Sequence, residues 1–172
     1  MKRFSISLFI VFILSSSIFG VTLVGEVVEV EDGDTITIYV KGKGYYDIRL
    51  LGIDAPETKR NAKFKQDITK VYKGNEYNVF VRVPPQALLD LGHQAKWRLR
   101  SLIMGKTVSV EIEGVDRYRR NLGWVWLNGT LVNEYMVRQG LAKPYMLKGR
   151  YSFRIRTAEQ QAKNNKIGIY AY

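Results

Sequence analysis

The strongest constraint on the fold of this chain is a series of strand-like segments in its first third, each followed by turn residues. Residues 21–30 are rich in valine, and residues 32–34 read Asp-Gly-Asp, which is typical of a turn. Residues 35–40 alternate and are β-branched, and glycines within residues 42–44 predict a second turn before the strand-like residues 45–53. Three strands joined by tight turns predict an antiparallel meander.

A helix and two more strands are predicted in the middle of the chain. Apolar residues recur at helical spacing up to Gly105, which is a candidate helix stop. Residues 107–112 alternate again, and residues 123–127 are apolar and lead into an Asn-Gly turn.

The end of the chain predicts two helices. Thr130 is placed to cap a helix that Gly140 ends, and a last helix is predicted over residues 152–166. The resulting order, βββ-α-ββ-α-α, is that of an OB fold, a five-stranded β-barrel with helices whose closure removes the sheet edges.

Residues 59–85 interrupt this pattern. Six cations lie within residues 59–73, at positions 59, 60, 63, 65, 70 and 73, and the only acidic residues of the segment are Asp67 and Glu76. Residues 77–83 are compatible with a short extra strand that two prolines end. We therefore expect a long, partly mobile basic insertion, which is either functional or merely tolerated.

Composition limits the chemistry that the chain can perform. The 172 residues indicate one domain, and the absence of cysteine excludes disulfides, thiolate nucleophiles and cysteine-based metal sites. The single histidine, His93, excludes sites built on two histidines and is expected to cap a helix or lie at the surface. The net charge of +11 favours a polyanionic partner, although a solvated basic face would give the same value.

Residues 1–20 have the pattern of a secretory signal. Lys2 and Arg3 precede an apolar run, and small residues follow it. The run is shorter than the ~20 apolar residues of a membrane span, so we expect cleavage and a secreted or extracytoplasmic domain over residues 21–172, with a net charge near +9. If the segment is retained, the protein is membrane-anchored. We expect a monomer without a protein partner.

Three acidic residues carry the main chemical signal. Asp34 lies at the start of the second predicted strand, and Asp54 and Glu57 lie just past the third. A meander can bring these points together at one end of the barrel, where a hard cation would relieve the repulsion between carboxylates. The carbonyl of Ala55 is a further candidate ligand. The alternative is that Asp34 and Asp54 hydrogen-bond turn amides.

Two arginines are suited to a phosphate. Arg49 lies between apolar residues of the third strand, and Arg120 ends the run Asp-Arg-Tyr-Arg-Arg. A planar guanidinium can donate to two phosphate oxygens at once. Together with a metal and a carboxylate base, the two arginines would form a phosphodiesterase site. The alternative for each arginine is a surface salt bridge, which contributes ~0–1 kcal/mol.

The chain resembles the micrococcal nuclease (thermonuclease) family of secreted, calcium-dependent OB-fold nucleases. The similarity spans nearly the whole chain after the signal, in the family's order. The matching stretches are residues 32–35 (DGDT), 49–57 (RLLGIDAPE), 92–95 (GHQA, opening a helix), 116–120 (DRYRR), 132–134 (VNE), 137–143 (VRQGLAK) and 159–163 (EQQAK).

The resemblance implies a role for each matching site residue. It implies Asp34, Asp54 and the Ala55 carbonyl as Ca²⁺ ligands, Glu57 as general base, and Arg49 and Arg120 as phosphate-binding catalytic arginines. It also implies that Arg117, Tyr118 and Tyr145 contact the nucleotide. The implied reaction is hydrolysis of DNA and RNA with low sequence specificity that leaves 3′-phosphates.

The sequence departs from the family pattern at several points. Arg119 replaces the usual glycine before the second catalytic arginine and is a rival for the role of Arg120. Tyr145 is displaced by one place from the family tyrosine, and the basic insertion is longer than the family loop.

Other candidate residues have simpler interpretations. Trp124 and Trp126 share one face of a strand, where core packing is favoured over base stacking. The cations at positions 143, 148, 150, 154 and 156 are expected to be solvated and to add only to the general field.

Two competing functions remain open from the sequence. A non-catalytic OB module would bind nucleic acid without cleaving it, although the acidic cluster argues against pure binding. A surface-tethered protein would capture extracellular DNA through residues 59–73 if the N-terminal segment is retained.

Overall fold

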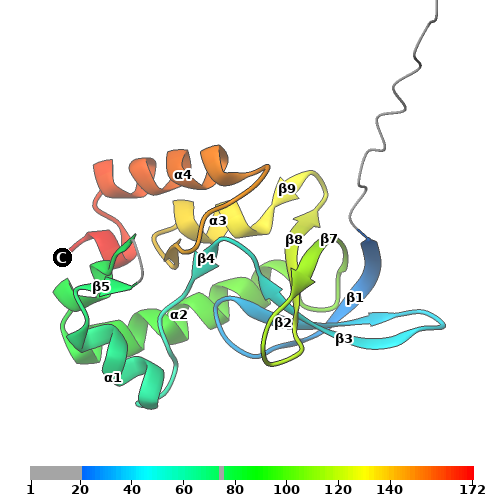
Figure 1. Ribbon diagram of the computed structural model, residues 1–172, viewed down its shortest axis with the longest axis horizontal. Helices are drawn as coiled ribbons and strands as arrows, with labels where there is room; N and C mark the ends of the chain where they lie inside the picture. The colour runs from blue at the N-terminus through cyan, green and yellow to red at the C-terminus, as the bar shows by residue number, and fades with distance from the viewer. Residues whose placement is uncertain (1–20, 74–75) are drawn as a thin grey trace, which may run out of the picture.

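The computed structural model describes residues 21–73 and 76–172, and it begins with the predicted meander (Figure 1). Strands β1 (Thr22–Val30), β2 (Thr35–Val40) and β3 (Gly44–Leu50) pair in antiparallel register. Side chains of β1 alternate between buried and exposed, because successive residues of a strand point to opposite faces of the sheet.

The sheet closes into a five-stranded barrel. β1 also pairs with β7 (Thr107–Val115), which pairs with β8 (Asn121–Leu127), and a parallel pairing of β3 with β8 completes the ring. The two-residue strand β9 (Thr130–Leu131) follows the Asn-Gly turn and pairs in antiparallel register with the end of β8. The predicted OB-type barrel is confirmed, with β7 and β8 longer than expected.

The third predicted strand is broken before the acidic motif. β3 ends at Leu50, and Gly52 adopts a φ of 75°, a left-handed conformation that glycine adopts without a Cβ clash. The chain then re-enters extended structure as β4 (Ile53–Asp54), which pairs with β10 (Lys143–Pro144) rather than with the barrel. This break turns Asp54 toward a distant part of the chain.

The basic insertion is folded, so the prediction of a long loop is wrong for its described residues. It contains helix α1 (Ala62–Thr69), the hairpin β5 (Tyr72–Lys73) and β6 (Glu76–Tyr77), and the 3-10 helix η1 (Val79–Arg82). The strand expected over residues 77–83 is therefore also wrong beyond Tyr77. Phe64 and Phe80 are fully buried, which explains why the segment folds onto the domain.

Helix α2 (Pro85–Ile103) starts well before the point expected. Pro85 occupies its first turn, where a missing N–H costs nothing, and Gly105 follows its end with a φ of 69°. Gly92 therefore lies inside the helix and does not open it, and His93 is an exposed mid-helix residue rather than a cap.

The C-terminal part contains α3 (Val132–Arg138), α4 (Ser152–Asn164) and the 3-10 helix η2 (Gly168–Tyr170). Thr130 belongs to β9 instead of capping α3, whose N-terminal flanking residue is Leu131. Gly140 follows α3 with a φ of 64°, as predicted.

One core joins the barrel to the helices. Trp124 is fully buried on β8, which confirms core packing for this tryptophan, while Trp126 is half-buried against Tyr151. Within residues 21–73 and 76–172, no helix is long and apolar enough to cross a membrane. The predicted signal, residues 1–20, lies outside the described residues.

Candidate active site

Asp34 and Asp54 converge on one guanidinium at the mouth of the barrel. Asp34 immediately precedes β2 and Asp54 ends β4, and their side chains are 7% and 1% exposed. Nη2 of Arg49, on β3, lies 3.0 Å from Oδ2 of Asp34 and 3.4 Å from Oδ1 of Asp54. Two carboxylates that are distant in sequence therefore point at a common position, as the meander predicted.

The environment of Arg49 fixes the orientation of this cluster. Its Nη1 donates to the carbonyls of Leu50 and Ile53, on both sides of the strand break. Burial alone would lower the pKa of Arg49, but the carboxylates of Asp34 and Asp54 raise it above its usual value. The arginine therefore stays charged although its side chain is only 12% exposed.

Asp34 also has the amide partner that the alternative interpretation expected. Its Oδ2 accepts a 2.7 Å hydrogen bond from the backbone N–H of Ala55, and its Oδ1 accepts one from the Thr35 hydroxyl. Asp34 therefore links the turn after β1 to the acidic motif that begins in β4. In the same turn, burial and the neighbouring carboxylate of Asp34 raise the pKa of Asp32 to about 7.

Lys63 joins Glu57 to the cluster, and sequence reasoning missed it. Its Nζ lies 2.7 Å from Oε1 of Glu57, 3.2 Å from Oδ1 of Asp54 and 3.1 Å from Oδ2 of Asp67, one turn along α1. Oε2 of Glu57 accepts from Asn61, the N-cap of α1. Burial would lower the pKa of Lys63, but the carboxylates, Asp54 first, raise it above its usual value. The i, i+4 spacing of Lys63 and Asp67 was the available signal, and it required recognising α1.

Lys143 was expected to be solvated, and this prediction is wrong. It is 2% exposed, and its Nζ lies 3.3 Å from Oδ2 of Asp54 without a well-formed hydrogen bond. The β4–β10 pairing places the two residues directly opposite each other. Its ammonium also lies 5.1 Å from the ring centroid of Phe80.

Arg120 reaches the same mouth from the loop between β7 and β8. Asp116 accepts from the backbone and guanidinium of Arg120, so the loop is closed on itself. Burial would raise the pKa of Asp116, but these hydrogen bonds lower it below its usual value. Nη1 of Arg120 donates to the Thr35 hydroxyl, which itself contacts Asp34. Contacts thus run without a gap from Arg120 through Asp34, Arg49, Asp54 and Lys63 to Glu57.

The position of Arg119 favours Arg120 as the inward arginine. Arg119 is exposed and has a φ of 67°, a conformation in which glycine is preferred. Tyr118 is 64% exposed, with the guanidinium carbons of Arg117 and Arg120 at 4.7 Å and 5.5 Å from its ring centroid. The loop therefore presents an aromatic face between two cations, next to the inward guanidinium.

Tyr145 lies beside the cluster. Its backbone N–H donates to the carbonyl of Gly52, and its ring centroid is 5.2 Å from Nζ of Lys143. Every predicted site residue except the exposed pair Arg117 and Tyr118 is thus half-buried or buried at this mouth.

The donor set is compatible with a hard divalent cation. Asp34 and Asp54 offer buried carboxylate oxygens that already surround one cationic group, and Ca²⁺ takes such oxygens together with carbonyls and water. Among the described residues, no group of three or more acidic or histidine side chains is arranged to hold a metal. The remaining ligands would therefore have to be backbone carbonyls, such as that of Ala55, and water.

The fold and this site define an OB-fold protein with acidic and guanidinium groups gathered at one mouth of the barrel. Comparisons with known proteins agree. The family model described as staphylococcal nuclease homologue matches residues 47–172. The chain belongs to the staphylococcal nuclease family.

The chain is also similar to several named proteins. The chain is 30% identical over 155 residues to a thermonuclease of Staphylococcus hyicus, covering 85% of this chain and 75% of the relative. It is 34% identical over 137 residues to an uncharacterized endonuclease of Escherichia coli O157:H7 (79% and 70% covered) and 32% identical over 157 residues to protein ParB of Escherichia coli (86% and 72% covered).

Proposed function

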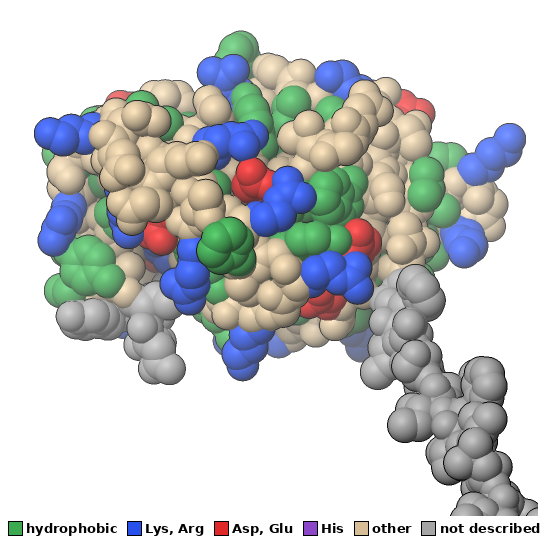
Figure 2. All heavy atoms as spheres, turned by 90° about the horizontal axis from the view of Figure 1, so that it is seen from above, with side chains coloured by type: hydrophobic (Ala, Val, Ile, Leu, Met, Phe, Trp, Pro, Cys, Tyr) green, Lys and Arg blue, Asp and Glu red, His purple; other side chains and the backbone are tan. Residues whose placement is uncertain are grey.

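We propose that this protein is a metal-dependent nuclease, with Ca²⁺ as its cofactor, that hydrolyses phosphodiester bonds of DNA and RNA. The observation that carries the proposal is the unbroken set of contacts from Glu57 to Arg120 through the two carboxylates that share Arg49. The names of the thermonuclease and endonuclease relatives support it. The surface seen from the side of α4 carries many Lys and Arg side chains and few acidic ones, which suits a polyanionic substrate (Figure 2).

The candidate site residues have separate roles in the proposed hydrolysis. Arg49 and Arg120 bind the non-bridging phosphoryl oxygens and stabilise the charge that grows on them as water attacks phosphorus. Glu57 accepts the proton of that water, and the 5′ oxygen departs, leaving a 3′-phosphate. Because these residues contact the phosphate and not the bases, the sequence specificity of cleavage is low.

Asp34, Asp54 and the carbonyl of Ala55 would hold the metal. When bound, the cation supplies positive charge that polarises the phosphate and orients the water. Arg117, Tyr118 and Tyr145 are the proposed nucleotide contacts beside this centre. We further propose that residues 1–20 are a cleaved secretion signal. N-terminal sequencing of the extracellular protein tests this, and retention of residues 1–20 would contradict it.

The decisive experiment measures cleavage of plasmid DNA, single-stranded DNA and RNA by the purified chain with calcium, magnesium or chelator, and identifies the product ends. We expect calcium-dependent cleavage that leaves 3′-phosphates. Glu57→Gln and Arg49→Ala should each lower kcat by about 10²–10⁴-fold, as expected for a lost base or a lost charge-stabilising donor.

Matched control variants distinguish the loss of a catalytic group from a general effect of changing the net charge or the stability of the protein. Glu29→Gln and Arg98→Ala replace the same residue types at exposed positions and should retain activity. Salt-dependent binding of DNA without any product in excess calcium would contradict the proposal and identify a non-catalytic OB module instead.

A further inference from the structure

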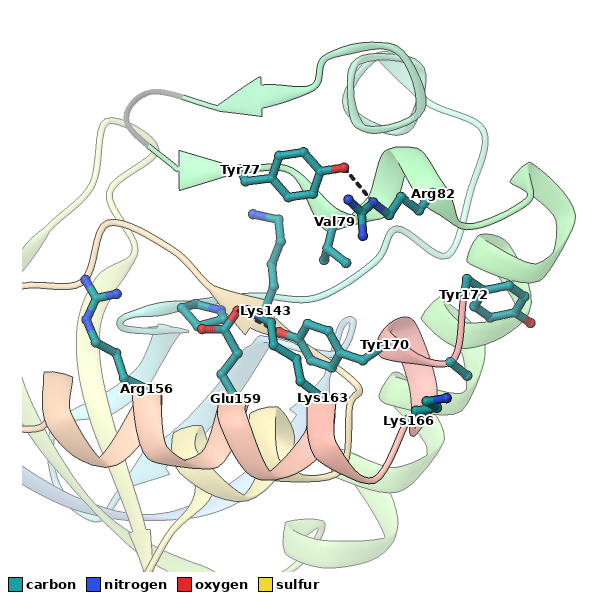
Figure 3. Close-up of a pocket in the computed structure, with 12 residues that line it drawn as sticks. Tyr77, Val79, Arg82, Lys143, Arg156, Glu159, Lys163, Lys166, Tyr170 and Tyr172 are labelled. Carbon is teal, nitrogen blue, oxygen red and sulfur yellow. Dashed lines mark hydrogen bonds and ion pairs between the residues drawn. The ribbon is translucent and has the colours of Figure 1, made fainter.

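A basic cleft lies beside the candidate active site, between the folded insertion and the C-terminal elements. Its volume is about 730 Å³. In Figure 3, β6 and η1 form one wall, and α4 with the C-terminal segment forms the other. The lining side chains that matter here are Tyr77, Arg82, Lys143, Arg156, Lys166 and Tyr172.

The cleft is strongly cationic. Five Lys and Arg side chains line it against one acidic side chain, that of Glu159, which is already paired with Lys163 at 2.8 Å. Arg156 and Lys166 are exposed, and neither has an ion-pair partner within residues 21–73 and 76–172. Like charges gathered around a hollow attract a polyanion, because their fields add there.

Aromatic rings are interleaved with these cations. Tyr77 is 41% exposed and Tyr172 is 53% exposed, one on each wall. The guanidinium carbon of Arg82 lies 5.0 Å from the ring centroid of Tyr77, and its Nε donates to the Tyr77 hydroxyl, so this ring is held in place. A positive groove with exposed aromatic rings is the arrangement that binds single-stranded nucleic acid, since every unpaired base has a face that can stack.

Lys143 connects the cleft to Asp54, one of the proposed metal-binding carboxylates. It lines the cleft on β10 and is buried, yet its Nζ has no well-formed hydrogen bond and lies 3.3 Å from Oδ2 of Asp54. The charge of this buried ammonium adds to the positive field of the cleft. The cleft and the candidate active site therefore meet across a single side chain.

We propose that this cleft binds the single-stranded continuation of the substrate beyond the cleaved bond. The inference rests on the proposed function for the identity of the substrate, but not for the cleft itself. Bases in a duplex are stacked and paired, so they cannot reach the rings of Tyr77 and Tyr172.

The test compares binding of fluorescent oligothymidylates of about 4 and about 16 nucleotides, and of a duplex, without added metal. The variants are Tyr172→Ala and the double change Arg156→Ala with Lys166→Ala, all at exposed positions where the fold tolerates change. The controls are Tyr45→Ala and the double change Lys41→Ala with Lys43→Ala, on the exposed β2–β3 hairpin.

We expect Tyr172→Ala to weaken binding of the long single strand about tenfold, with a much smaller effect on the duplex. The double variant should also reduce the salt slope for single strands by about 1.4, which is ~0.7 for each lost phosphate contact. Equal losses for single strand and duplex, or losses no larger than those of the controls, would overturn the proposal.

Together with the cleavage experiment with calcium, magnesium or chelator, this binding experiment distinguishes the two proposals. If the wild-type chain binds single strands through the cleft but cleaves no nucleic acid, the proposed nuclease function is wrong and the proposed binding role of the cleft is supported. If the chain cleaves nucleic acid but the cleft variants bind single strands with the same affinity as the controls, the proposed role of the cleft is wrong and the proposed nuclease function is supported.

Discussion

At the scale of single residues, Asp54 is the centre of the site. Three cations from different parts of the chain lie 3.2–3.4 Å from its oxygens, namely Arg49, Lys63 and Lys143. A buried carboxylate remains ionised only when such partners replace its lost hydration. The site thus combines strong local charges with little solvent, which is the condition under which electrostatic stabilisation of a transition state is effective.

Lys63→Met tests the role of the lysine that joins Glu57 to Asp54. We expect the free energy of unfolding to fall by about 1–3 kcal/mol, less than for a fully buried pair because the lysine is 35% exposed. The pKa of Lys63 is raised in the folded state, so its contribution is fully present below the unfolded pKa and is lost only as pH rises through the folded pKa. The difference from wild type should therefore be constant between about pH 6 and 9 in urea unfolding.

Lys65→Met is the matched control on the same helix, because Lys65 is exposed and has no ion-pair partner among the described residues. It should change stability by less than about 0.5 kcal/mol. Equal effects of the two changes would show that the ion pairs of Lys63 contribute nothing.

At the scale of elements, α2 positions the acidic motif through small residues. A Cβ added at Gly92 would collide with the backbone carbonyl of Glu57, and one added at Gly33 would meet the methyl groups of Ala55 and Ala95 at 2.6 Å and 2.7 Å. The helix, the turn before Asp34 and the segment after Asp54 can therefore approach closely only because these side chains are small or absent. This close approach sets where the Glu57 backbone lies.

Gly92→Ala should both destabilise the protein and lower its activity. In an exposed helix interior the same change stabilises by about 1 kcal/mol, because alanine is the better helix former. Here we expect a loss of about 1–3 kcal/mol in unfolding free energy and a lower kcat, since the backbone of Glu57 must shift.

Gln94→Ala, at an exposed position of α2, provides the comparison. It should be neutral or slightly stabilising and should leave kcat unchanged. A stabilised and fully active Gly92→Ala variant would contradict the packing argument.

At the scale of the whole molecule, the basic insertion is part of the domain. Phe64, Phe80 and Val83 belong to the same core as the barrel residue Trp124. Asn78, 1% exposed, donates to the carbonyls of Asp67 and Lys70 and so fastens α1 to η1. The insertion thereby holds Lys63 over the carboxylates and forms one wall of the basic cleft.

Phe80→Ala should cost about 3–5 kcal/mol in unfolding free energy, because it leaves a cavity in a shared core. Phe153→Ala removes the same ring at a position that is 81% exposed and should cost less than about 0.5 kcal/mol. A single cooperative transition that shifts for Phe80→Ala, followed by both circular dichroism and tryptophan fluorescence, would show that the insertion unfolds with the barrel. A small effect of Phe80→Ala would mean that the insertion is an independent appendage.

The sequence by itself determined the barrel, and it singled out the main candidate site residues. Alternation in residues 22–40, the turns at Asn128–Gly129 and the stops at Gly105 and Gly140 all depend on local preferences, which neighbouring residues fix. Asp34, Asp54 and Arg49 are recognisable because they lie at the ends of such elements.

Only the tertiary structure decided the surroundings of the site. Lys143 is buried against Asp54 because β10 pairs with β4, and Lys63 reaches Glu57 because α1 forms within a segment whose charges predict a loop. Both outcomes depend on contacts between residues that are distant in sequence, and apolar anchors such as Phe80 outweigh the local preference for solvent. The basic cleft arises in the same way, since its two walls meet only after the chain has folded.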